Sequence, residues 1–483
     1  MRALPLDIGL IHFVGIGGIG MSGIAEVLHN LGYQVQGSDL AENANVQRLR
    51  SLGIAVAVGQ RAENLGGAQV VVVSSAVKRG NPELEAARER FIPIVRRAEM
   101  LAELMRLKWS IAVGGTHGKT TTTSMVGTLL ETAGLDPTVI NGGIINAYGT
   151  NTRLGAGDWM AVEADESDGT FTKLPAVIAI VTNMDSDVNL SAEPFRDLNF
   201  DTEETMVRVK KMFEVFSNRL PEEGRLILCW DHERVGELGA TIDRPTITYG
   251  FSPDADLTVK ELELDGLRSR AEVVYKGQAL GIMSLHVPGK HNVCNALAAI
   301  AVGLELGIDP ATILSALAKF EGVQRRFQIL GESNGVTVVD DYAHNPQKVE
   351  AALHAAKVAA KKSQGRVVAV FQPHRYTRTK FLYSEFLTSC HEADLLLVTD
   401  IYSAGEPPIL GLRVENLVQE IGQKAPHVEI FHTPKEQDVM RRLDLVTRPG
   451  DIVITLGAGD VGRWGSRFLL HDTTDHLVTK AVI

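Results

Sequence analysis

The chain has 483 residues, of which 45% are hydrophobic and 22% charged, as is usual for a globular protein; at ~150 residues a domain this predicts about three domains. Its 48 lysines and arginines against 59 aspartates and glutamates give a net charge of −11, which argues against general binding to nucleic acids or anionic lipids. No apolar run approaches the ~18 residues of a membrane span and no signal-peptide pattern opens the chain, so we expect a cytoplasmic protein.

The three cysteines, Cys229, Cys294 and Cys390, are far apart in the sequence and show no C-x-x-C spacing. Cysteines without such spacing are typical of proteins in a reducing compartment, where thiols seldom form disulfides. We therefore expect buried thiols that form neither a disulfide nor a zinc site.

The first predicted strand, residues 11–14, runs into a glycine-rich loop of the pattern G-x-G-x-x-G at residues 15–20. A helical pattern follows from Met21 to Leu31, and a second strand ends at Ser38-Asp39. An acid at this distance binds a ribose hydroxyl in dinucleotide-binding domains, so this region alone predicts NAD. The same turn can hold any diphosphate at a helix N-terminus, and a UDP-sugar is the alternative.

A second glycine loop begins after the predicted strand Ile111–Val113 and leads into a helical pattern from Lys119 to Ala133. Backbone N–H groups of such a loop bind phosphates, Lys119 can reach the β- and γ-phosphates, and the Thr120 hydroxyl can ligate Mg²⁺. The first glycine of the usual G-x-x-x-x-G-K-[ST] pattern is replaced by Val113. A glycine-rich turn with an exposed lysine is the alternative, but the combined features favour ATP. Two glycine loops in one chain fit two different phosphorylated ligands.

Four carboxylates follow the predicted strand 159–163 within six residues; they are Glu163, Asp165, Glu166 and Asp168. Their hard oxygen ligands beside a phosphate loop favour a Mg²⁺ site. The alternative is a solvated acidic loop, which is common for a run of like charges.

Two further polar clusters follow predicted strands in the last third of the chain, around His344 and over residues 372–378. Arg375 and Arg378, three residues apart, could bind a carboxylate bidentately. The alternation of strands and helices predicts an α/β protein with three doubly wound domains built on parallel sheets, whose ligands bind at the carboxyl ends of the strands. The predicted domains are residues 1–107, 108–324 and 325–483.

Over nearly its whole length the chain resembles the Mur ligases, which build the peptide stem of peptidoglycan. The segments that carry the resemblance are 14–23 with 37–39, 115–121, 163–168, 288–292 with Asn295, and 372–378. The resemblance implies a UDP-binding first domain, a central ATPase domain and a C-terminal amino-acid domain, and it replaces NAD by a UDP-sugar. It also implies ATP and Mg²⁺ as cofactors, and UDP-N-acetylmuramate and L-alanine as substrates that are joined through an acyl phosphate.

The resemblance also implies roles for individual residues. ATP would be bound by Gly115, Thr116, His117, Gly118, Lys119, Thr120, Thr121, His291, Asn292, Asn295 and Arg326, and Mg²⁺ by Thr120 and Glu163. The UDP-sugar would be bound by Gly15, Gly17, Gly18, Gly20, Ser38 and Asp39, and the carboxylate of L-alanine by Arg375 and Arg378. His344 is a candidate to assist deprotonation of the amine, although a single histidine at a strand end more often completes a hydrogen-bond network.

The sequence departs from the family at two positions that concern activity. Val188 stands where the family usually has a histidine that ligates a second Mg²⁺, and Asp185 or Asp187 could compensate because carboxylates bind Mg²⁺ well. Asn345 stands where the alanine-adding members usually have histidine. Two alternatives therefore stay open: a related ligase with another amino acid or a peptide as substrate, and a catalytically impaired Mur homologue.

Overall fold

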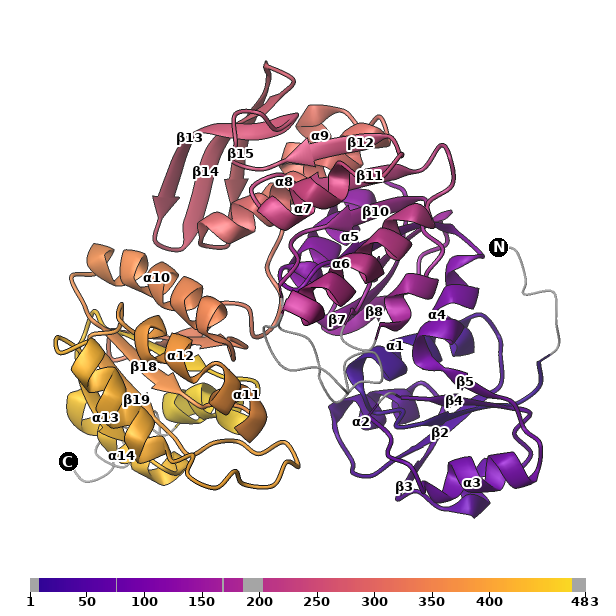
Figure 1. Cartoon of the computed structure of the whole chain (residues 1–483), viewed down its shortest axis with the longest axis horizontal. Helices are drawn as coiled ribbons and strands as arrows, with labels where there is room; N and C mark the ends of the chain where they lie inside the picture. The colour runs from indigo at the N-terminus through magenta and orange to yellow at the C-terminus, as the bar shows by residue number, and fades with distance from the viewer. Residues whose placement is uncertain (1–7, 75, 167–168, 186–202, 471–483) are drawn as a thin grey trace, which may run out of the picture. The chain divides into compact units, whose positions relative to one another are not determined.

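The computed structural model describes residues 8–74, 76–166, 169–185 and 203–470, which form three sheets flanked by helices (Figure 1). They belong to two compact units. The first unit comprises Met1–Lys260, Glu272–Met283 and Cys294–Phe320, and the second Glu261–Ala271, Ser284–Val293 and Glu321–Ile483. None of the described helices is both long and apolar enough to cross a membrane.

The N-terminal sheet has five parallel strands in the order β3-β2-β1-β4-β5. Its elements are β1 (Ile11–Val14), α1 (Ile19–Asn30), β2 (Val35–Asp39), α2 (Ala44–Ser51), β3 (Ala55–Val58), β4 (Val70–Val73), α3 (Pro82–Glu89), β5 (Ile94–Arg96) and α4 (Arg97–Met105). Phe13 belongs to one apolar cluster and the next residue, Val14, to another. Both faces of the sheet are therefore covered, as the apolar strand patterns predict.

The second sheet has ten strands in the order β15-β14-β13-β12-β11-β10-β6-β9-β7-β8. Its strands are β6 (Trp109–Gly114), β7 (Thr138–Ile145), β8 (Thr150–Arg153), β9 (Trp159–Glu163), β10 (Ile178–Val181), β11 (Arg225–Cys229), β12 (Thr246–Tyr249), β13 (Leu257–Asp265), β14 (Arg268–Tyr275) and β15 (Gln278–Leu285). The helices of this region are α5 (Lys119–Thr132), α6 (Glu203–Asn218), α7 (Glu233–Gly239), α8 (Lys290–Glu305) and α9 (Pro310–Ala318). Strand β6 lies between β9 and β10 and is parallel to both.

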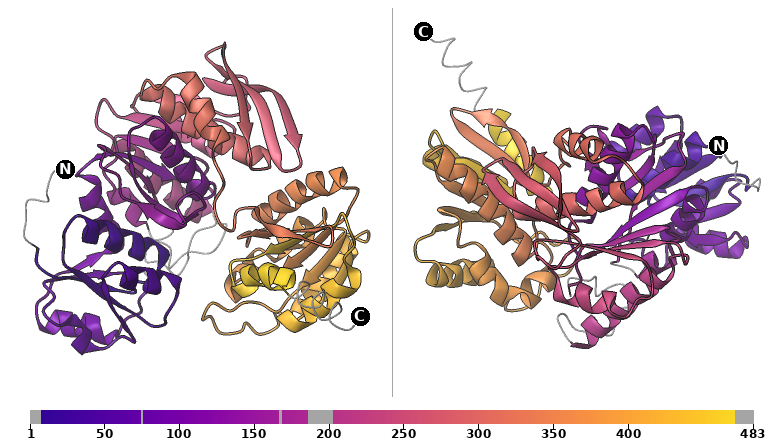
Figure 2. Two further views of the ribbon diagram at one scale, coloured as in Figure 1. Left: turned by 180° about the vertical axis from the view of Figure 1, so that it is seen from behind. Right: turned by 90° about the horizontal axis from the view of Figure 1, so that it is seen from above.

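The C-terminal sheet has six strands in the order β16-β17-β21-β18-β19-β20. Its elements are β16 (Gln328–Ser333), β17 (Val336–Asp341), α10 (Pro346–Lys362), β18 (Val367–Phe371), α11 (Tyr376–Phe381), α12 (Tyr383–Ser389), β19 (Leu395–Val398), α13 (Val414–Lys424), β20 (Glu429–His432), α14 (Glu436–Val446) and β21 (Ile452–Leu456). Alternate residues of β18 join different apolar clusters, and helices cover both faces of this sheet (Figure 2).

The predicted three-domain α/β architecture is confirmed, with two differences from purely parallel sheets. The edge strands β8 and β16 run antiparallel to β7 and β17. Strands β13 to β15 extend the second sheet, although no continuous apolar run predicts them. Charged residues alternate with apolar ones along β13, and most of its side chains are at least partly exposed.

A buried polar network lies beneath the carboxyl end of the N-terminal sheet, around Glu83 of α3. The Glu83 carboxylate accepts hydrogen bonds from Ser38 Oγ at 2.6 Å and Asn64 Nδ2 at 2.5 Å, and it lies 3.3 Å from His12 Nε2. Burial raises the pKa of Glu83, but the hydrogen bonds from His12, Ser38 and Asn64 outweigh it and lower the pKa below its ordinary value. The Ser38 hydroxyl, predicted to bind the UDP-sugar, therefore donates its hydrogen bond to a buried carboxylate within the domain.

We expect Glu83→Ala to lower the free energy of unfolding of the first unit by about 3–5 kcal/mol, because several buried donors lose their acceptor. Urea unfolding measures the change. Glu89→Ala, at an exposed position of the same helix, is the matched control and should stay within about 0.5 kcal/mol of wild type. Equal stability of the two variants would contradict this role of Glu83.

Candidate functional site

The phosphate loop predicted between β6 and α5 has the backbone that such a loop requires. Gly115 and Gly118 have φ values of +132° and +83°, which favour glycine, and Gly118 immediately precedes α5. A Cβ at Gly115 would collide with Thr182, and one at Gly118 would lie 2.5 Å from Asn295 Oδ1. The structure therefore places Asn295 of α8 directly against the loop.

Lys119, the first residue of α5, is mostly shielded from solvent and forms an ion pair with a buried carboxylate. Its Nζ lies 2.6 Å from Glu166 Oε2 and donates to the Gly115 carbonyl at 2.6 Å. Burial lowers the pKa of Lys119, but the carboxylates of Glu166, Asp165 and Glu163 outweigh this and raise it, so the ammonium stays charged. Burial raises the pKa of Glu166 to about 7, against the opposing effect of Lys119. The ionised form of Glu166 is thus costly.

The segment after β10 supports the loop from the side. His117 N donates to Asn183 Oδ1 at 2.7 Å, and Thr182 Oγ1 donates to the His117 carbonyl at 2.6 Å. The Asp185 carboxylate lies 3.3 Å from His117 Nε2 and 3.3 Å from His232 Nε2. Burial raises the pKa of Asp185, but these two histidines outweigh it and lower the pKa.

Asp185 therefore has partners within the protein besides any role toward a metal, while Asp187 and Val188 lie outside the described residues. Sequence reasoning missed the supporting roles of Thr182, Asn183 and His232. The polar Thr-Asn pair directly after an apolar strand was the available signal for the first two.

Three carboxylates of the acidic cluster after β9 each contact a different partner. Glu163 Oε2 accepts from the Gly142 backbone N at 2.8 Å, Asp165 lies 3.4 Å from Arg97, and Glu166 pairs with Lys119. Asp168 lies outside the described residues. The alternative of a merely solvated acidic loop is wrong for Glu166, which is only 4% exposed.

Glu163 and Thr120 are linked through the middle of β7. Asn141 Nδ2 donates to the Thr120 carbonyl at 3.2 Å, and its neighbour Gly142 donates to Glu163. Glu163 is half-buried and offers hard carboxylate oxygens beside the first turn of α5. This donor set fits Mg²⁺.

The N-terminal glycine loop folds over the end of β2. Gly15 N and Ile16 N both donate to the Ser38 carbonyl at 2.9 Å, and Gly17 N donates to Asp39 Oδ2 at 2.8 Å. Gly18 caps the N-terminus of α1. The acid and the loop, 22 residues apart in the sequence, are thus in contact.

In the C-terminal unit, the polar clusters after β17 and β18 lie together. The rings of His344 and His374 are 6.1 Å apart, and Arg378 Nη1 donates to His374 Nδ1 at 3.1 Å. His374 stacks on Tyr402 with 5.5 Å between centroids, and Arg375 N donates to the Tyr402 carbonyl at 2.8 Å. The structure therefore brings His344, Arg375 and Arg378 into one cluster.

The hydrogen bonds of Arg375 and His344 define which of their polar atoms are engaged within the protein. The buried Nε of Arg375 has no hydrogen-bond partner in the described part of the chain, and Arg375 has a φ of +69°. His344 Nδ1 lies 2.7 Å from the Tyr342 carbonyl and must donate to it, which leaves Nε2 as the basic nitrogen of the neutral ring.

The other predicted residues have local partners. Asn292 Nδ2 donates to the Pro288 carbonyl at 2.7 Å, His291 is exposed, and the Arg326 guanidinium lies 5.2 Å from the centre of the Tyr342 ring. Asn345 Oδ1 accepts from Lys348 N and caps α10. Asparagine is well suited to that position, which gives its presence there a structural reason.

Comparison with known proteins assigns the chain to a family. Three family models match consecutive segments: "Mur ligase family, catalytic domain" at residues 10–109, "Mur ligase middle domain" at 113–303 and "Mur ligase, glutamate ligase domain" at 325–459. The UDP-N-acetylmuramate–L-alanine ligase of Rhodospirillum centenum is 53% identical to this chain, over 97% of this chain and 95% of its own length. The chain belongs to the Mur ligase family.

Other relatives agree with this assignment. The enzyme of the same name from Rhizobium meliloti is 51% identical over 96% of this Mur ligase and 97% of its own chain. Among solved structures, the UDP-N-acetylmuramate–alanine ligase of Thermotoga maritima has a TM-score of 0.80 and 30% identity, covering 96% of this chain and 99% of its own. The murein peptide ligase of Psychrobacter arcticus, at 23% identity, TM-score 0.69, and 96% and 98% coverage, shares the fold.

We expect His374 to make this Mur ligase less stable on mild acidification. Burial and the charges of Arg378, Arg375 and Arg325 lower the pKa of His374 to about 4, so between pH 6.5 and 4 the unfolded chain binds a proton that the folded chain does not. Stability should fall as the pH falls through this window. The loss between pH 7 and 5 should be about 1 kcal/mol smaller in His374→Gln than in wild type, because the ring is partly exposed.

Urea unfolding at the two pH values measures this difference. His354→Gln, at an exposed histidine of α10, serves as the control and should keep the wild-type pH dependence. An unchanged pH dependence in His374→Gln would show that His374 titrates normally.

Proposed function

We propose that this Mur ligase joins L-alanine to the lactyl carboxylate of UDP-N-acetylmuramate at the expense of ATP, in the cytoplasmic synthesis of peptidoglycan precursors. The observation that carries the proposal is the 53% identity, across nearly the whole chain, to relatives that bear the name of this reaction. The arginine and histidine cluster of the C-terminal unit supplies groups suited to an amino acid.

The first step brings two anions together, because the lactyl carboxylate attacks the γ-phosphoryl group of ATP to form an acyl phosphate. Lys119, held charged in a buried position, neutralises the transferring phosphoryl group. The backbone N–H groups at the start of α5 bind the phosphates. Thr120 and Glu163 would hold Mg²⁺, which supplies further positive charge there.

The remaining nucleotide contacts are assigned from the resemblance to the Mur ligases. Asn295 lies against Gly118 of the phosphate loop, and we assign it with His291 and Asn292 to the adenine side of ATP. Arg326 is assigned to the same nucleotide. In the N-terminal domain, the loop at residues 15–20 and Asp39 bind the UDP-sugar, with the diphosphate at the N-terminus of α1.

In the second step the amine of L-alanine attacks the acyl carbonyl, and phosphate leaves. Arg375 and Arg378 bind the carboxylate of L-alanine, since the planar guanidinium group matches a carboxylate with two parallel hydrogen bonds. With Nδ1 donating to the Tyr342 carbonyl, Nε2 is the nitrogen through which a neutral His344 would assist loss of the amine proton. A Mur ligase that adds another amino acid or a peptide would need the same contact to a carboxylate. These arginines therefore do not distinguish it from a ligase that adds L-alanine, and only a comparison of substrates does.

Lys119→Ala should lower turnover by ~10³ or more, because the charge on the transferring phosphoryl group loses its counter-ion. The substitution also leaves Glu166 buried without its partner, so a loss of stability could mimic this result. The double variant Lys119→Ala/Glu166→Ala removes both charges and should recover the thermal midpoint without recovering turnover. Near-wild-type turnover in the folded double variant would exclude this loop as the catalytic ATP site.

Arg375→Lys keeps the charge but loses the planar fork, so the KM for L-alanine should rise at least about tenfold while the KM for ATP stays nearly constant. Steady-state phosphate release with each substrate varied in turn measures both constants. Lys380→Ala, at an exposed position of α11, the helix that follows Arg375, is the control and should change neither. Equal increases in both KM values would assign Arg375 a general structural role.

A further inference from the structure

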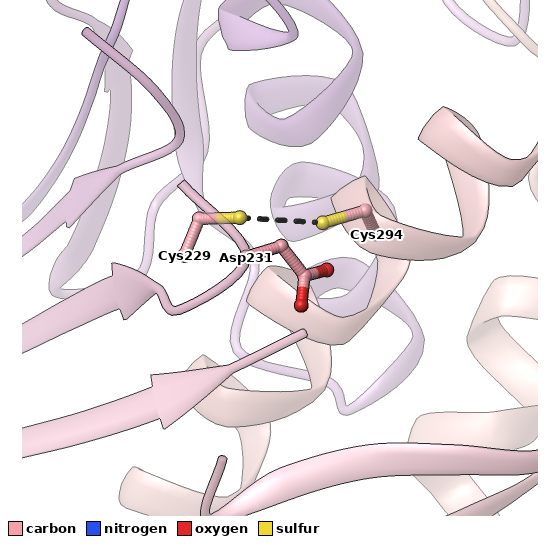
Figure 3. Close-up of side chains that lie close together, drawn as sticks. All are labelled: Cys229, Asp231 and Cys294. Carbon is pink, nitrogen blue, oxygen red and sulfur yellow. Dashed lines mark hydrogen bonds between the residues drawn. The ribbon is translucent and has the colours of Figure 1, made fainter. Parts of the chain in front are cut away.

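Two of the three cysteines lie side by side, although they are 65 residues apart in the sequence. Cys229 is the last residue of β11 and Cys294 is the fifth residue of α8, yet their Sγ atoms are 3.6 Å apart. A carboxylate oxygen of Asp231 completes a group whose three ligand atoms all lie within 4.8 Å of one another (Figure 3). Figure 3 shows the two sulfurs directed at each other, with the carboxylate beside them.

The spacing of the two sulfurs fits a metal ion better than a disulfide. A tetrahedral zinc ion with Zn–S bonds of about 2.3 Å holds two thiolate sulfurs about 3.8 Å apart. A disulfide requires about 2.05 Å, so the sulfurs would have to approach by roughly 1.5 Å. The observed distance of 3.6 Å is therefore close to the edge of a metal tetrahedron.

We propose that Cys229, Cys294 and Asp231 bind a thiophilic divalent cation such as Zn²⁺, with a water molecule as the fourth ligand. On binding, each thiol releases its proton to solvent and a metal–sulfur bond forms, with no change of oxidation state. Two thiolates and one carboxylate suit Zn²⁺, whereas Mg²⁺ prefers oxygen ligands. The Mg²⁺ that accompanies ATP therefore does not compete for this site.

The surroundings of Asp231 hold its carboxylate in place. Its oxygens accept hydrogen bonds from Phe251 N at 2.8 and 2.9 Å and from Ser252 N at 2.9 Å. Such contacts orient a ligand before the metal arrives. Cys229 is 5% exposed while Asp231 is exposed, so an ion can enter from the Asp231 side.

The site is separate from the phosphate loop but adjoins one of its contacts. Cys294 immediately precedes Asn295, the residue of α8 that lies against Gly118. A bound ion would tie the N-terminal half of α8 to the end of β11. The proposal goes beyond the ligase reaction, and its test does not use turnover.

Titration of the reduced full-length protein with Cd²⁺, which also prefers thiolates, tests the proposal through the thiolate-to-metal absorption in the ultraviolet. We expect one ion per chain, displaced by Zn²⁺ but not by Mg²⁺. Cys294→Ser and Cys229→Ser should each weaken binding by at least about a hundredfold, because a ligand loss costs no less than the loss of a supporting contact. Asp231→Asn should weaken it as well.

Cys390→Ser is the matched control, because Cys390 is fully buried in the C-terminal unit and burial raises the pKa of its thiol to about 12. This variant should bind Cd²⁺ as wild type does. Undiminished binding in Cys294→Ser, absence of the thiolate absorption in wild type, or formation of a Cys229–Cys294 disulfide in place of metal binding would each overturn the proposal.

Discussion

The buried ion pair between Lys119 and Glu166 is the interaction on which the proposed chemistry depends. It keeps a charged lysine at the start of α5, at the position where a phosphate loop needs one. Burial disfavours the ionised form of the Glu166 carboxylate, as its raised pKa indicates, so this carboxylate is a weak counter-ion for Lys119. The phosphates of ATP can therefore replace Glu166 as the counter-charge of Lys119 without the lysine ever being left unpaired. This arrangement prepares the loop for an anion and explains why its lysine is stable in the protein interior.

The sheet topology places the supporting groups around that lysine. Strands β10, β6 and β9 are neighbours and run parallel, so their carboxyl ends meet at one edge of the sheet. The phosphate loop follows β6, Glu163 ends β9, and the segment that contacts His117 follows β10. Three segments that are well separated in the sequence thus supply the loop, the acids and the loop's support. The same principle gathers His344 and Arg375 at the ends of β17 and β18 in the C-terminal unit.

Much of this could be predicted from sequence because both the strands and the motifs carry local signals. Strand β18 is a continuous apolar run, and the observed bounds of β1 agree with the predicted residues 11–14. Strands β13 to β16 lack that signal because many of their side chains meet solvent, and β8 lacks it because its buried residues are polar. The direction of a side chain could not be predicted from neighbouring residues in the sequence either. Ser38 lies at the end of a strand, but its hydroxyl donates to the buried Glu83. The partners of Asp185 and the contact between Cys229 and Cys294 depend on residues 47 to 68 positions away.

The most direct test of the central claim is phosphate release by the purified chain with Mg²⁺-ATP, UDP-N-acetylmuramate and a panel of amino acids and peptides. The account predicts release only when all substrates are present, with L-alanine strongly preferred and one amide product formed for each phosphate. Preference for another amino acid or for a peptide would assign a different ligase activity to this chain. Absence of release with every acceptor, from a protein that still binds ATP, would contradict the account and favour a catalytically impaired Mur homologue.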